Sequence, residues 1–94
     1  MNKKDLYKQK LQAELDEWQA DVDKMKAKLG GASVGAKLEI NQEINQLEGK
    51  LGEGRNKLEE LSEATEENWE NLKASIDETW EGIANSFKDT FGKF

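Results

Sequence analysis

Residues 30–35, GGASVG, divide two stretches of the chain that share the same apolar rhythm. Before this segment, large apolar residues recur at alternating spacings of four and three, and after it the same alternation resumes. Such spacing places one narrow apolar seam along an α-helix, as in a coiled coil. The three glycines can supply the positive φ angles of a helix C-cap and a tight reversal. The segment therefore predicts a turn between two helices, at about residues 3–29 and 36–62.

The two seams can be paired across this turn. Facing residues in an antiparallel hairpin have numbers with a constant sum, and one register of this chain places the turn on the glycines. In that register the two residue numbers of every facing pair add to 65 or 66. We therefore expect an antiparallel coiled-coil hairpin, in which Trp18 is part of the seam. The pairs are Leu29 with Ala36, Met25 with Ile40, Val22 with Ile44, Trp18 with Leu47, Leu15 with Leu51, Leu11 with Gly54 and Tyr7 with Leu58.

The second helix contains glycines at positions 49, 52 and 54, and Gly54 stands at a seam position. Each costs about 0.8–1 kcal/mol relative to Ala in a helix interior. They either weaken this helix locally or form a hinge. At Gly54, the missing side chain could also admit Leu11 or Tyr7 from across the seam.

The last third of the chain carries a different repeat. EENWENLKASI, residues 66–76, matches DETWEGIANSF, residues 77–87, in the class of residue at all but two positions. A period of eleven residues gives about 3.67 residues per turn, which keeps an apolar stripe nearly straight along a helix. We expect an amphipathic helix at about residues 66–92. Its interaction stripe is Trp69, Leu72, Ile76, Trp80, Ile83, Phe87, Phe91 and Phe94.

These patterns predict an all-α protein with a single helical domain, residues 1–94. The chain either breaks near residues 62–66, where Ser62 or Thr65 can cap a new helix, or continues as one helix. The third helix either folds back on the hairpin as a three-helix bundle or packs between subunits. Monomers seldom expose a large apolar patch, so the stripe must cover protein or lipid.

The composition argues against several classes of function. The 94 residues include no His, Cys or Pro, and the net charge is −6. Without His or Cys the commonest acid–base and nucleophilic groups are missing, so we expect no enzyme and no catalytic, cofactor-binding or metal site. An acidic chain without a basic stripe is a poor nucleic-acid binder. There is no apolar secretory signal or membrane span in the sequence, and we expect a cytoplasmic location.

Two segments resemble a family of short bacterial coiled-coil proteins, some labelled stress-response proteins and some apolipoprotein-like. They are KKDLYKQKLQAELDEWQADVDKMKAK, residues 3–28, and NWENLKASIDETWEGI, residues 68–83. The glycines between residues 30 and 54 depart from the Ala- and Glu-rich middle expected for that family. The resemblance implies a stress-related role and no catalytic residues.

Two kinds of function follow from these observations. The first is a non-enzymatic helical interaction or structural protein, whose stripe serves self-association, to a dimer or higher, or packs on another helical protein. The alternative is reversible binding of a lipid surface or of unfolded clients through the 11-residue-repeat helix. Few lysines flank the stripe, which favours clients or zwitterionic lipid over an anionic membrane.

Overall fold

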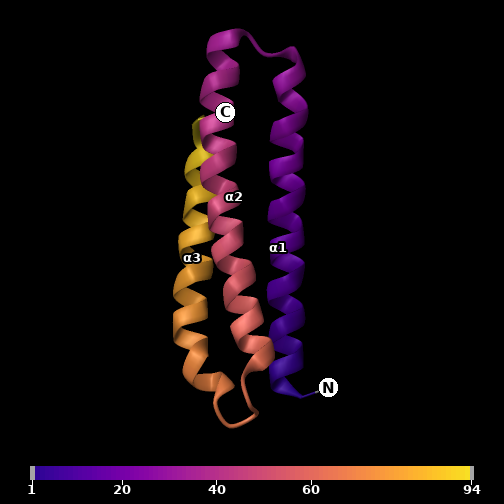
Figure 1. Ribbon diagram of the computed structural model, residues 1–94, viewed down its shortest axis with the longest axis vertical. Helices are drawn as coiled ribbons and strands as arrows, with labels where there is room; N and C mark the ends of the chain where they lie inside the picture. The colour runs from indigo at the N-terminus through magenta and orange to yellow at the C-terminus, as the bar shows by residue number, and fades with distance from the viewer. Residues whose placement is uncertain (1, 94) are drawn as a thin grey trace.

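The computed structural model describes residues 2–93 as three helices packed along one another (Figure 1). Helix α1 spans Lys3–Lys28, α2 spans Val34–Glu63 and α3 spans Trp69–Lys93. A short 3-10 turn, η1, spans Leu29–Gly31. Residues 2–93 contain no strand. The predicted all-α fold is confirmed: α1 and α2 form an antiparallel hairpin, and α3 folds back along it.

The hairpin turn does not use the backbone conformation that the glycines were expected to supply. No glycine among residues 2–93 has a positive φ, so that expectation was wrong. Instead, η1 tightens the end of α1, and Ser33 then caps α2 by accepting a hydrogen bond from the Ala36 backbone N–H at 3.4 Å. Because α2 begins at Val34, the reversal is shorter than the predicted turn.

The chain breaks between α2 and α3, which was one of the two alternatives left open. Ala64 is extended, and the Thr65 hydroxyl accepts a hydrogen bond from the Asn68 backbone N–H at 3.2 Å. Lys4 of α1 donates to the carbonyl oxygens of Ser62 and Ala64 at this end of the bundle. A lysine there satisfies carbonyls that a helix end leaves unpaired.

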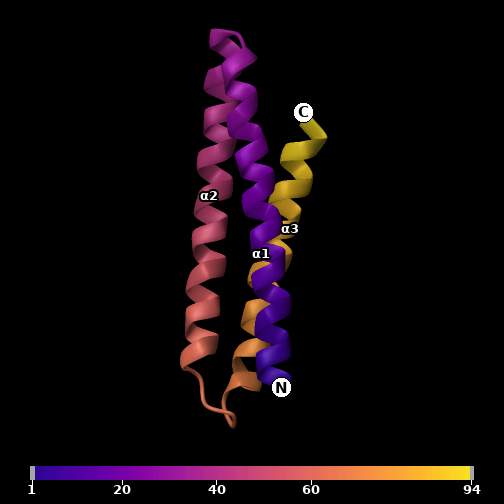
Figure 2. The ribbon, with the colours of Figure 1, turned by 90° about the vertical axis from the view of Figure 1, so that its right-hand side faces the viewer.

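All three helices contribute to one apolar core inside a rod of 52 × 20 × 19 Å (Figure 2). Among residues 2–93, no helix has the length and apolar character needed to cross a bilayer. Four core residues come from α1, six from α2 and five from α3. They are Leu11, Leu15, Val22, Met25, Ile40, Ile44, Leu47, Leu51, Leu58, Leu61, Trp69, Ile76, Trp80, Ile83 and Phe87.

Helix α2 continues through its three glycines, but they occupy different surroundings. A Cβ atom on Gly54 would lie 2.9 Å from Leu15 Cδ2 and 3.0 Å from Ile83 Cδ1. The nearest side chains that Gly54 admits are therefore Leu15 and those of α3, and not the Leu11 or Tyr7 named from the sequence. A Cβ atom on Gly49 or Gly52 would meet nothing within 4 Å.

This contrast predicts opposite effects for one substitution at two positions. Gly49→Ala should raise the free energy of unfolding by about 0.5–1 kcal/mol, because Ala is the better helix former and the space is open. Gly54→Ala should lower the free energy of unfolding by about 1 kcal/mol. Overpacking the core costs about 1–3 kcal/mol, which exceeds the gain from the better helix propensity of Ala. Urea denaturation of both variants in dilute solution measures the two changes. Equal stabilisation by both would contradict the close approach at Gly54.

Candidate interaction surfaces

The predicted stripe lies mostly in the interior of the bundle. Trp69, Ile76, Trp80, Ile83 and Phe87 are buried against the hairpin, with Ile76 and Ile83 at zero exposure. Leu72 is half-buried at the edge of the core, and Phe91 is 41% exposed. Phe94 lies outside the described residues. The structure therefore brings five of the eight stripe residues into the core and leaves Phe91 partly exposed.

Aromatic rings bridge α3 to α1. The Trp18 ring is stacked on Phe87 with ring centroids 5.7 Å apart, and it lies 6.2 Å from the Trp80 ring. Phe87 in turn lies 6.0 Å from Phe91. Trp18 was expected in the seam between the first two helices, but its ring contacts α3. Aromatic pairs of this kind contribute about 0.5–1.5 kcal/mol each beyond the area they bury.

Tyr7 makes the second bridge, near the start of α3. Its ring centroid lies 5.9 Å from that of Trp69, and the Lys73 ammonium lies 5.5 Å from the centre of the Tyr7 ring. The Tyr7 hydroxyl donates a hydrogen bond to the Asp77 carboxylate. Burial and this hydrogen bond both raise the pKa of Tyr7 well above its ordinary value of 10.0.

A buried hydroxyl joins the last turns of α3 to α2. Thr90 is 3% exposed, and its Oγ1 donates to Glu43 Oε2 at 3.0 Å. A buried hydroxyl without a partner would cost free energy, so this contact holds α3 to the hairpin at a fixed level. Neither Thr90 nor Glu43 stood out in the sequence, because a polar residue three positions after Phe87 gives a weaker signal of burial than the neighbouring Phe91 does.

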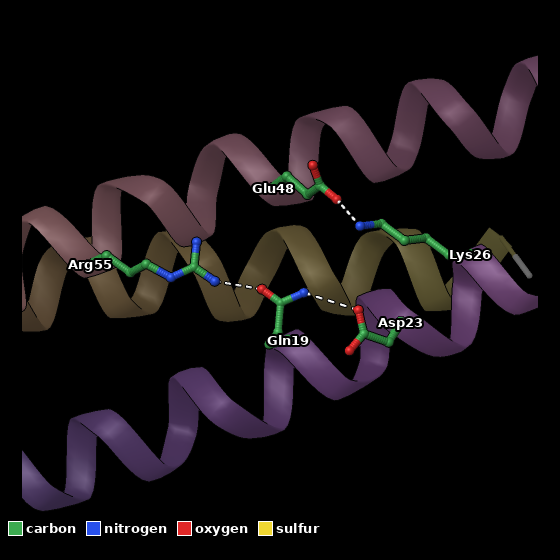
Figure 3. Close-up of polar contacts among 5 residues, drawn as sticks. All are labelled: Gln19, Asp23, Lys26, Glu48 and Arg55. Carbon is green, nitrogen blue, oxygen red and sulfur yellow. Dashed lines mark hydrogen bonds and ion pairs between the residues drawn. The ribbon is translucent and has the colours of Figure 1, made fainter.

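An ion pair and side-chain hydrogen bonds join α1 to α2 on one face of the hairpin (Figure 3). The Lys26 ammonium lies 2.6 Å from Glu48 Oε1, and this carboxylate raises the pKa of Lys26. Arg55 donates to Gln19 Oε1, and Gln19 Nε2 donates to Asp23 Oδ1 at 3.1 Å. Exposed pairs contribute little stability, but they fit only one register of the hairpin.

The surface also carries apolar side chains. Val34 is 77% exposed and Leu38 is 64% exposed, both in the first turns of α2, and Leu6 on α1 is 55% exposed. Phe91 lies beside a small cleft that is also lined by Met25, Lys28 and Ile40. No group of three or more acidic, His or Cys side chains in the described part of the chain could hold a metal ion. The candidate interaction surfaces are therefore the outer faces of the helices, where these apolar side chains are exposed.

Comparisons of this chain with protein-family models, with curated proteins and with solved structures found no match.

The Tyr7 contacts predict a pH effect above neutrality. Because the folded-state pKa is raised above the unfolded value of about 10, the stabilisation is complete below pH ~10 and is lost as pH rises further. Tyr7 is the only tyrosine in the chain, so its ultraviolet absorbance reports this one group. We expect its titration midpoint well above pH 10 in the folded protein.

The variant Asp77→Asn supplies the control for this titration. It removes the carboxylate acceptor and should move the midpoint back toward the ordinary tyrosine value. A wild-type midpoint near pH 10 would contradict the buried hydrogen bond.

Proposed function

We propose that this chain is a non-enzymatic helical interaction protein that acts as a closed three-helix bundle. Its aromatic stripe serves mainly to pack α3 on the chain's own hairpin. Partners, either a second copy or another helical protein, meet the outer faces of the helices. A cytoplasmic location and the stress-related role implied by the family resemblance remain predictions within this proposal.

The burial of the stripe is the observation that carries the proposal. Trp69 is 7% exposed and Trp80 is 6% exposed, so most of the large apolar surface expected from the sequence is already covered within one chain. Burying each such side chain contributes about 1.5–3 kcal/mol. A partner that competes for the stripe would have to replace that burial, whereas a partner on an outer face would not.

The polar contacts of α3 also support a closed form. Tyr7 of α1 bonds to Asp77 in the first half of α3, and Glu43 of α2 bonds to Thr90 in its last turn. These contacts tie α3 to both helices of the hairpin. Each is lost if α3 detaches.

A second function, lipid or client binding by α3, is favoured by one specific observation. The buried Trp80 Nε1–H has no hydrogen-bond partner among the described residues. An unpaired buried donor costs about 1–3 kcal/mol, and an interfacial lipid layer would let the indole N–H reach water. Release of α3 would thus relieve one unfavourable contact while losing the rest of its packing.

Tryptophan emission separates these two functions. In the variant Trp18→Phe, only Trp69 and Trp80 report. We expect blue emission in buffer, because both indoles are buried, and no change on addition of either zwitterionic or anionic vesicles. Emission in denaturant gives the fully exposed reference.

The contrary result has a clear form. Red emission in buffer that moves to the blue on vesicles would mean that the stripe is free until a lipid surface covers it. The closed-bundle function would then be wrong and the lipid function favoured.

A further inference from the structure

The outer face of α2 is uncharged over most of its length. Leu38 lies about 200° around the helix from the core residue Ile40, so it points away from the core. Figure 2 shows α2 at one side of the bundle, with α3 on its inner side. A line of uncharged residues follows this outer face at spacings of four and three, as in a seam, and we call it the outer line. An uncharged line is notable because 36% of the chain is charged. The outer line consists of Val34, Leu38, Asn41, Asn45, Gly49 and Gly52.

This outer line has both protruding and hollow positions. Val34 and Leu38 project into solvent with 77% and 64% of their surfaces exposed. Gly49 and Gly52 leave open space where a side chain would stand, since a Cβ atom there would meet nothing within 4 Å. The bundle's own packing does not require these glycines, although each costs about 0.8–1 kcal/mol in a helix.

The protrusions and hollows match when α2 is paired with an antiparallel copy of itself. A two-fold axis near the middle of the outer line brings together residues whose numbers add to 86 or 87. Leu38 then faces Gly49 of the second copy, and Val34 faces Gly52. Two-fold symmetry repeats each contact, so four apolar side chains meet four glycines.

Polar groups fit the same register. Asn41 faces Asn45 of the second copy, and two side-chain amides can exchange hydrogen bonds. Lys37 and Glu48 flank the outer line on the same side. In this pairing Lys37 of one copy lies near Glu48 of the other, and the two-fold axis repeats the contact. Their charges are opposite, so the flank is attractive even with Glu48 also paired to Lys26 of its own chain, whereas a register that paired Lys37 with Lys37 would be repulsive.

We propose that a second copy of this chain docks on the outer face of α2, with the two α2 helices antiparallel. The inference rests on the proposed function of the closed bundle and names its partner. A complementary face that pairs with itself is what a two-fold dimer requires. The face spans about 30 Å at 1.5 Å per residue, and its small, partly polar contact suits a reversible dimer.

Sedimentation equilibrium of the intact protein tests the dimer. We expect a monomer in dilute solution and a dimer as concentration rises. Leu38→Glu should weaken the dimer at least about tenfold, because it places charge in an apolar contact. Leu6→Glu is the matched control, since Leu6 is an exposed leucine on α1 and should leave the dimer unchanged.

A second variant keeps the test independent of folding. Gly49→Gln fills the hollow that receives Leu38, so it should weaken the dimer at least about tenfold. The same variant should make each chain more resistant to unfolding, because glutamine is a better helix former than glycine. Weaker association in a more stable chain cannot be explained by misfolding.

Disulfide formation tests the register, because the chain has no native cysteine. Val34→Cys chains mixed with Gly52→Cys chains should form a mixed disulfide on mild oxidation. Val34→Cys chains alone should not, since their two sulfurs would lie about 27 Å apart along the helices.

Several results would overturn the dimer. They are a monomer at every concentration, equal effects of Leu38→Glu and Leu6→Glu, efficient cross-linking of Val34→Cys chains alone, and a monomer that binds vesicles through Leu38. A monomer with Trp69 and Trp80 still buried would leave the proposed function standing. Exposed tryptophans in buffer would remove the proposed function itself.

Discussion

The close approach at Gly54 is the constraint on which the bundle depends. Leu15 of α1 and Ile83 and Trp80 of α3 all lie within 3.4 Å of the place where a Cβ atom would stand on α2. One missing side chain thus lets two neighbouring helices reach the same point of the central seam. A narrow seam normally serves one partner helix, and at Gly54 the missing Cβ atom lets the seam of α2 contact two. The aromatic rings of α3 then fill the wider space toward α1.

Polar contacts act at the ends and on the outside of this core. Asn2 caps α1 and Ser33 caps α2, while Lys4 binds the carbonyls that end α2. The Lys26 pair with Glu48 lies on the hairpin surface. These contacts contribute less free energy than the core, but they exclude shifted arrangements of the same seams. Apolar burial therefore holds the helices together, and the polar groups select the register.

The sequence predicted the helices well because their seams are periodic, and it predicted the surroundings of single residues poorly. The heptads and the turn at residues 30–35 sufficed for the hairpin, and the eleven-residue repeat sufficed for α3. The role of Gly54, the ring contacts of Trp18 and the burial of Thr90 depend on how far apart the three helices lie. That distance is set by the summed volume of facing side chains, which no single periodic pattern contains.

The buried stripe and the exposed outer face of α2 are structurally independent. Opening α3 to expose Trp80 would forfeit the packing around Gly54, with only the unpaired indole N–H gaining a partner. Docking on Val34 and Leu38 disturbs none of those contacts, because both side chains already point away from the core. The glycines of α2 fall into the same two groups. Gly54 is needed in the core, whereas Gly49 and Gly52 leave open space on the outer face. A chain built this way can associate through α2 while its aromatic core stays closed, so association and core stability can change separately.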